Sequence, residues 1–235
     1  MSLKIVFMGS PAFALPSLEI LIKHSFPVVA VVTAPDKPQG RGRQLRPSPV
    51  KEAALRHKLL LLQPVDLKDF SFRAGLSALC PDLIIVVAFR ILPPEVYRIP
   101  RLGSFNLHAS LLPKYRGAAP IERALMNGES VTGVTTFLLR EQVDTGAILL
   151  QQPVAIGPDE TAGELRDRLA EAGAGLVLET VRLFADGRVH AVPQVDAEAS
   201  PAPKIRREEC WIDWTRTGRE IHNLVRGLSP DPAAM

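Results

Sequence analysis

Leu83-Ile84-Ile85-Val86-Val87 carries the clearest signal of the fold, because every residue in it is aliphatic. A strand of this composition is typical of a sheet that is covered on both faces. Further strand-like runs occur at Lys4–Met8, Val28–Thr33 and Gly103–Leu107, and segments with helical spacing separate them, as at Ala14–His24. This alternation predicts an α/β fold with a largely parallel sheet.

The rest of the chain adds shorter elements and one long helix. Helices are expected at Lys51–His57, Asp66–Leu79 and Ala119–Met126, and strands at Leu59–Leu62, Gly133–Leu139 and Ala147–Val154. Helical spacing then continues over Thr161–Ala185, where Thr161 and Glu164 have the spacing of a capping box. The stretch Val192–Pro203 is rich in proline and alanine, which predicts a linker.

The composition is that of an ordinary globular protein, with 46% hydrophobic and 23% charged residues. No apolar run approaches the roughly 20 residues needed to cross a bilayer, and the N-terminus lacks the pattern of a signal peptide. Cys80 and Cys210 lie far apart, which indicates free thiols in a reducing compartment and offers no spacing for a zinc site. We therefore expect a cytoplasmic protein that binds neither a metal nor a membrane.

Three polar residues are candidates for chemistry. Asn106 and His108 lie two apart at the end of an expected strand, so both side chains face the same side of the sheet. Ligands usually bind at this edge of an α/β sheet, and the two side chains offer donors for an oxyanion. Asp144, in the turn Asp144-Thr145-Gly146, could orient His108 or hold it charged. Taken alone, such a pair is more often structural and such a turn is more often only a turn.

A longer string around these residues carries a family signature. Asn106-Leu107-His108-Ala109-Ser110-Leu111-Leu112-Pro113-Lys114-Tyr115-Arg116-Gly117 resembles the signature of the 10-formyltetrahydrofolate-dependent formyltransferases, and Asp144-Thr145-Gly146 follows at the spacing of that family. The resemblance implies a Rossmann-like, mostly parallel sheet with flanking helices. It also implies that Asn106, His108 and Asp144 are the catalytic residues.

The same resemblance implies 10-formyltetrahydrofolate as the co-substrate. Its pocket is expected to be lined by Phe89, Arg90, Ile91, Leu92, Ser110, Leu111, Leu112 and Pro113. The loop Ala88–Pro93 departs from the commonest family sequence, which has Ala-Tyr-Gly, one more residue and then Ile-Leu-Pro. The loss of a glycine and of one residue should tighten the pocket, and Arg90 adds a charge.

The acceptor is indicated by the segment 35–51, which has five basic residues and one acid between Asp36 and Lys51. Its glycines and prolines predict a loop without helix or strand. A basic, glycine-rich loop suits a phosphate backbone, although on its own it would be interpreted as a solvated surface loop. The segment is similar to a loop of those family members that formylate initiator methionyl-tRNA, as is Ala118-Ala119-Pro120-Ile121. The resemblance implies that Lys37, Arg41, Arg43 and Arg46 contact the tRNA.

Three regions are expected along the chain. Residues 1–190 form the catalytic domain, residues 191–203 form the linker, and residues 204–235 begin the family's C-terminal β-barrel domain, most of which lies outside this sequence. Residues 204–235 are too few to bury a core of their own. We expect the protein to be a monomer.

The implied reaction is an acyl transfer in which the amine of methionine attacks the formyl carbon. Asn106 would donate to the oxyanion, His108 would add a second donor as the imidazolium, and Asp144 would stabilise that charge and help to move a proton. Other interpretations are a formyltransferase for a small amine such as a sugar nucleotide, a formyl-folate hydrolase, or a non-catalytic RNA-binding protein. A nucleotide-dependent dehydrogenase is disfavoured, because Gly9-Ser10-Pro11 lacks the Gly-x-Gly-x-x-Gly spacing.

Overall fold

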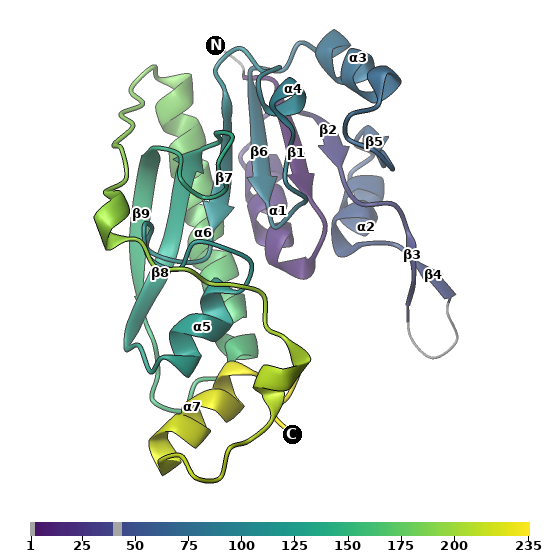
Figure 1. Cartoon of the computed structure of the whole chain (residues 1–235). Helices are drawn as coiled ribbons and strands as arrows, with labels where there is room; N and C mark the ends of the chain where they lie inside the picture. The colour runs from purple at the N-terminus through teal and green to yellow at the C-terminus, as the bar shows by residue number, and fades with distance from the viewer. Residues whose placement is uncertain (1–2, 40–43) are drawn as a thin grey trace.

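A seven-stranded sheet in the order β5-β2-β1-β6-β7-β8-β9 forms the centre of the computed structural model, which describes residues 3–39 and 44–235 (Figure 1). The strands are β1 (Ile5–Gly9), β2 (Val28–Val32), β5 (Leu61–Leu62), β6 (Leu83–Val87), β7 (Ser104–His108), β8 (Val131–Leu138) and β9 (Ile148–Ala155). The strands from β5 to β7 are parallel, whereas β8 is antiparallel to both of its neighbours. The predicted α/β fold with a largely parallel sheet is therefore confirmed.

The aliphatic strands are explained by two apolar clusters, one on each face of the sheet. Ile85 and Val87 of β6 belong to the first cluster, with residues of α1 and α6, whereas Ile84 and Val86 belong to the second, with residues of α3 and α4. Successive side chains of a strand point to opposite faces. Every position of β6 is therefore buried, and none can be polar without cost.

Helices cover both faces. They are α1 (Leu15–Lys23), α2 (Pro49–Arg56), α3 (Phe70–Ala78), α4 (Pro94–Tyr97), α5 (Pro120–Met126), α6 (Ala162–Ala185) and α7 (Gly218–Gly227), with 3₁₀ turns at Ala12–Ala14, Asp196–Glu198 and Arg207–Cys210. The predicted capping box is confirmed, since Thr161 accepts from the amide of Glu164, whose carboxylate accepts from the amide of Thr161. At Gly173 a Cβ would lie 2.6 Å from the side chain of Leu107, so this glycine lets α6 approach the sheet closely.

The basic segment 35–51 contains regular structure, and the prediction of a loop without strands was wrong. Strands β3 (Lys37–Gln39) and β4 (Gln44–Arg46) pair as an antiparallel hairpin that projects from the body of the molecule (Figure 1). A two-stranded sheet has only edge strands, and an edge tolerates a proline such as Pro38.

Residues 191–203, which we name the connecting segment, lie against the body of the protein. Val192 forms a bridge with Ile148 of β9, and Pro201 forms a bridge with Arg116. Figure 1 shows this yellow-green segment crossing in front of β8 on its way to α7. None of the helices within the described ranges combines the length and apolar composition that a membrane crossing requires.

Candidate active site

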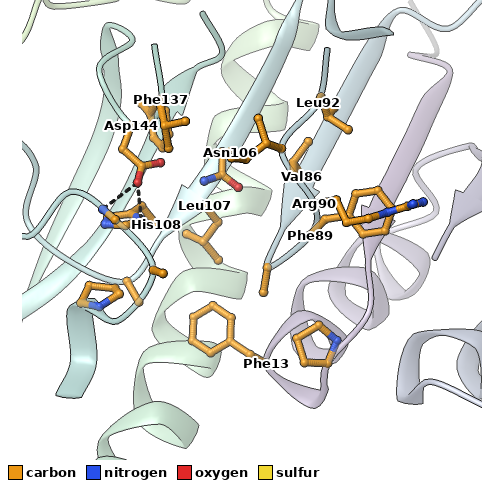
Figure 2. A pocket seen from close by; sticks show the side chains of 18 of the residues that line it. Phe13, Val86, Phe89, Arg90, Leu92, Asn106, Leu107, His108, Phe137 and Asp144 are labelled. Atoms are coloured by element: carbon orange, nitrogen blue, oxygen red, sulfur yellow. Dashed lines mark hydrogen bonds and ion pairs between the residues drawn. The ribbon is translucent and has the colours of Figure 1, made fainter. Parts of the chain in front are cut away.

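A pocket of about 930 Å³ lies where β6 and β7 end. Its apolar wall includes Phe13, Val86 and Phe137, and its polar residues include all three candidates for chemistry, Asn106, His108 and Asp144 (Figure 2). A pocket of this size, mostly apolar with a few polar groups, is typical of sites for small organic ligands.

Strand β7 brings Asn106 and His108 to the pocket. Asn106 pairs with Val86 of β6, whose side chain lies on the α3 and α4 face, so both residues of the predicted pair lie on this face. Leu107 between them is buried in the cluster on the other face. The amide of Asn106 makes no hydrogen bond to any residue in the described ranges, and it points into the pocket, where it can bind a ligand (Figure 2).

His108 is held between a backbone carbonyl and a carboxylate. Its Nε2 lies 2.8 Å from the carbonyl oxygen of Tyr115, and its Nδ1 lies 3.8 Å from Oδ2 of Asp144. A carbonyl oxygen only accepts hydrogen bonds, so Nε2 carries a proton and donates it to Tyr115. The side chains of His108 and Asp144 are only 7% and 10% exposed. Charge on either group is therefore poorly screened by water.

Asp144 reaches the pocket from the loop between β8 and β9. Its backbone is left-handed, with a φ of 54°, and its Oδ2 accepts a hydrogen bond of 2.9 Å from the amide of Gly117. At Gly146 a Cβ would overlap with the carbonyl oxygen of Leu138, so the turn requires glycine there. The loop thus holds the carboxylate against His108, as the turn Asp144-Thr145-Gly146 predicted (Figure 2).

The loop after β6 forms one wall of the pocket. Phe89, Arg90, Ile91 and Leu92, which were predicted to bind the folate, all line it. Arg90 turns outward, where it donates to the carbonyl oxygens of Pro64 (2.7 Å) and Val65 (2.9 Å) and stacks on Phe89. Burial lowers the pKa of the Arg90 guanidinium. Through its two hydrogen bonds, Arg90 attaches the loop after β6 to the segment that contains Pro64 and Val65.

The other four residues that were predicted to bind the folate lie outside the pocket. Ser110, Leu111, Leu112 and Pro113 do not line the pocket. Ser110 is completely buried, and its hydroxyl donates to the carbonyl oxygen of Lys114 at 2.6 Å. These four residues support the segment that continues to Tyr115 and Gly117, so their contribution to the site is indirect.

Two of the four basic residues predicted to contact tRNA, Lys37 and Arg46, lie in the paired strands β3 and β4. Lys37 in β3 pairs with Arg46 in β4, and the side chain of Arg46 is exposed. Arg41 and Arg43 lie outside the described residues. Arg46 is not among the described residues that line the pocket.

Several residues that the sequence did not single out also shape the site. Glu122 and Arg166 line the pocket and form an ion pair of 2.8 Å, and Asp231 lines it from the C-terminal end of the chain. Glu122 follows directly after Ala118-Ala119-Pro120-Ile121, so its position next to this motif could have identified it as a candidate site residue. Arg166 and Asp231 have no local signal, because they reach the pocket through the packing of α6 and the last residues.

Within the described part of the chain, no group of three or more His, Cys, Asp or Glu side chains is arranged to hold a metal ion.

Comparison with known sequences gives the family context. The sequence model of a family described as formyl transferase matches residues 3–181, and that of the formyl transferase C-terminal domain matches residues 204–235. A protein of Flavobacterium johnsoniae named methionyl-tRNA formyltransferase is 53% identical, and the match covers 99% of this chain and 74% of that protein. A protein of the same name from Chlorobium luteolum is 52% identical, with coverage of 99% and 75%.

Solved structures share the fold. The N-formyltransferase from Helicobacter canadensis, in complex with folinic acid and dTDP-3-aminofucose, gives a TM-score of 0.75 at 23% identity and covers 96% of this chain and 80% of its own. HypX from Aquifex aeolicus, in complex with tetrahydrofolic acid, gives 0.74 at 20% identity, with coverage of 100% and 36%.

Proposed function

Since the chain belongs to the formyl transferase family, we propose that it transfers the formyl group of 10-formyltetrahydrofolate to the α-amine of methionine on initiator methionyl-tRNA, which supports translation initiation. The observation that carries the reaction is the convergence of Asn106, His108 and Asp144 on one pocket. The choice of acceptor rests on relatives with that name, which are about half identical over nearly the whole chain.

The pocket suits a folate. Its volume of about 930 Å³ and the aromatic side chains of Phe89 and Phe137 can enclose a flat heterocyclic ring, and the unpartnered amide of Asn106 supplies a polar contact. The folate supplies the formyl group on its N10 atom. We assign Phe89, Ile91 and Leu92 to its binding because all three line the pocket, with Phe89 and Leu92 on the side of Asn106 (Figure 2).

Asn106 acts as a donor to the formyl oxygen. Negative charge develops on this oxygen when the amine nitrogen bonds to the formyl carbon. An N–H donor stabilises this charge most strongly when it is fixed in advance and shielded from water. The Asn106 side chain meets both conditions, because a central strand of the sheet holds its backbone and the pocket surrounds its amide.

His108 and Asp144 move the proton. The attacking amine must lose one proton, and N10 must gain one when its bond to the formyl carbon breaks. Nε2 of His108 is committed to Tyr115, so Nδ1 is the atom that takes or gives this proton. Asp144, 3.8 Å away, stabilises the imidazolium whenever Nδ1 is protonated.

The remaining assignments follow from this reaction. Residues 1–190 act as the catalytic domain, and residues 204–235 begin the C-terminal domain. We propose that Lys37, Arg41, Arg43 and Arg46 contact the tRNA, since cations suit a phosphate backbone and Arg46 is exposed. We expect a cytoplasmic protein, because the acceptor is a component of cytoplasmic translation, and we expect it to act as a monomer.

The test is formyl transfer to charged initiator tRNA in the presence of 10-formyltetrahydrofolate. The Asn106→Ala and His108→Ala variants should each lower kcat by roughly 10²–10³-fold, the usual cost of one lost oxyanion donor. Rates within threefold of the wild type would refute the assigned roles. Transfer only to a sugar amine or to another small amine would keep the chemistry and reject the tRNA.

A further inference from the structure

Gln194 of the connecting segment lies at the junction of the two loops that frame the catalytic pair. Its Nε2 donates to the carbonyl oxygens of Asp144 (3.0 Å) and Gly146 (2.7 Å). Its Oε1 accepts from Nε (3.0 Å) and Nη2 (2.7 Å) of Arg116. The amide has only this one orientation available, because the reverse would place its oxygen against two carbonyls and its NH₂ against a guanidinium.

The first two bonds hold the loop that carries Asp144. Asp144 has a left-handed backbone, which costs free energy for a residue other than glycine and persists only where the surroundings enforce it. The carbonyls of Asp144 and Gly146 both accept from the same Gln194 nitrogen. One side chain therefore fixes the direction of the turn from which the carboxylate projects.

The other two bonds hold the loop from Tyr115 to Gly117. Ser200 adds to them, because its hydroxyl accepts from the amide of Tyr115 (2.9 Å) and its carbonyl accepts from the amide of Arg116 (2.9 Å). Ala202 donates to the carbonyl of Arg116 at 2.6 Å. At Gly117 a Cβ would lie 2.5 Å from the carbonyl oxygen of Ala202, so the contact is close packed.

The two loops meet at the catalytic pair. The carbonyl of Tyr115 binds Nε2 of His108, and the amide of Gly117 binds Oδ2 of Asp144. Arg116 lies between these two contacts, and it is the residue that Gln194 holds. The relative position of the imidazole and the carboxylate thus depends on groups that the connecting segment fixes.

We propose that Gln194 is a positioning residue for the formyl transfer, and that the connecting segment is part of the active site as well as a link between domains. The inference rests on the proposed function, since it assigns Gln194 a role through Asp144 and His108. Gln194 does not line the pocket. Its loss should therefore lower the rate of the chemical step and leave substrate binding largely intact.

The experiment compares Gln194→Ala with Glu198→Ala in steady-state formyl transfer. Glu198 is exposed on the same segment, and its side chain makes no hydrogen bond to another described residue, so its loss should be silent. Misplacement of a catalytic group by about 1 Å can cost roughly 10²-fold in rate. For Gln194→Ala we expect kcat to fall about 10–100-fold, with KM for both substrates within about threefold of the wild type.

A double-mutant cycle separates positioning from general stability. In an Asp144→Asn background the further loss of Gln194 should change kcat by less than about threefold, because the group that it positions is already disabled. Equal effects of Gln194→Ala in both backgrounds would overturn the proposal, as would a wild-type kcat in the single variant.

Amide exchange measured by NMR tests the geometry without any turnover. The amide proton of Gly117 should exchange faster in Gln194→Ala than in the wild type, and should be unchanged in Glu198→Ala. Unchanged exchange in Gln194→Ala would refute the positioning role even if the enzyme is active. If the wild-type chain transfers no formyl group but the Gly117 amide still exchanges faster in Gln194→Ala, the structural coupling holds and the proposed function is rejected.

Discussion

The residues around His108 fix its hydrogen-bonding partner over a wide range of pH. Tyr115 supplies the carbonyl that binds Nε2, and its phenol donates to Glu129 at 2.7 Å and accepts from Asn127 at 3.1 Å. Burial raises the pKa of Tyr115 to about 12. The phenol is therefore neutral and remains a donor to Glu129 at every pH at which the enzyme would work. The contacts that hold Tyr115 beside His108 therefore persist over that range.

Gly146 gives the first prediction, because it is the residue that lets the Asp144 turn pack against β8. The Gly146→Ala variant should lose activity by roughly 10²-fold, since a Cβ there overlaps with the carbonyl oxygen of Leu138 and displaces the carboxylate. The measurement is kcat for formyl transfer, with circular dichroism to check the fold.

Gly175→Ala is the matched control for this variant. Gly175 lies within α6, and a Cβ added there would have no neighbouring atom within 4 Å. Alanine there should leave kcat unchanged and stabilise the protein by roughly 0.5–1 kcal/mol, because glycine is a poor helix former. Equal kcat values for the two variants would show that the Asp144 turn tolerates displacement.

Among the elements, the β3–β4 hairpin gives a prediction about the tRNA. The Arg46→Ala variant should weaken binding of initiator tRNA and lower the slope of log K against log salt by about 1, because one phosphate contact is lost. Arg56→Ala on α2 is the control, since Arg56 is 64% exposed but lies outside the hairpin. An unchanged salt slope in Arg46→Ala would exclude a phosphate contact there.

The loop after β6 gives a prediction about the folate. The Arg90→Ala variant should raise KM for the folate by about tenfold, equivalent to about 1.4 kcal/mol, because the pocket wall loses its tether to Pro64 and Val65. The kcat should change little, since Arg90 does not touch His108 or Asp144. The control is Arg98→Ala, because Arg98 is an exposed arginine that is also stacked on an aromatic ring, that of Tyr97. This variant should leave KM for the folate and kcat unchanged.

The elements that the sequence predicted well are those with strong local patterns. Strand β6 could be predicted from its aliphatic run, and helix α6 from its capping box and helical spacing, because both patterns involve residues close in sequence. The two-residue period of β7 likewise predicted that Asn106 and His108 lie on the same face. The hairpin was missed because Pro38 argued against a strand. Gln194 was missed because its partner Asp144 lies 50 residues away, a contact that only the folded chain creates.

In the whole molecule, the C-terminal residues are attached to the body of the protein through several polar contacts, among them the bonds of Arg226 to the carbonyl of Gly157 and of the Gly163 amide to the carbonyl of Ser229. Arg123 of α5 binds the carboxylate of Glu209 through two nitrogens, at 2.6 and 3.0 Å, and donates to the carbonyl of Pro203. Both tryptophans, Trp211 and Trp214, lie just beyond this contact. Trp211 is 61% exposed and Trp214 is 78% exposed, so Trp211 is the more covered of the two and its fluorescence reports on the attachment of the C-terminal residues separately from the sheet.

The ion pair at Glu209 makes this attachment sensitive to acid. The hydrogen bond from Arg123 holds the pKa of Glu209 below its ordinary value of 4.5. A carboxyl group with a lowered pKa in the folded state contributes its stability above the unfolded pKa, and loses it as pH falls through the folded pKa. The attachment should therefore weaken below about pH 4.5, by an amount of the order of 1 kcal/mol for a partly exposed pair.

The Glu209→Gln variant should remove this pH dependence. Urea unfolding at pH 7 followed by tryptophan fluorescence should show an earlier transition than in the wild type. The difference should shrink at pH 3.5, which lies below the ordinary pKa of a glutamate, because the stability that the charged carboxylate contributes falls once the unfolded chain binds the proton. The urea transition followed by circular dichroism, which reports on the sheet and the helices, should shift less than the transition followed by fluorescence. Glu208→Gln neutralises the exposed neighbour and should match the wild type at both pH values. A Glu209→Gln transition that follows the wild type from pH 7 to pH 3.5 would mean that other contacts, such as the packing around the buried Cys210 and the bond of Arg226 to Gly157, attach these residues without the ion pair.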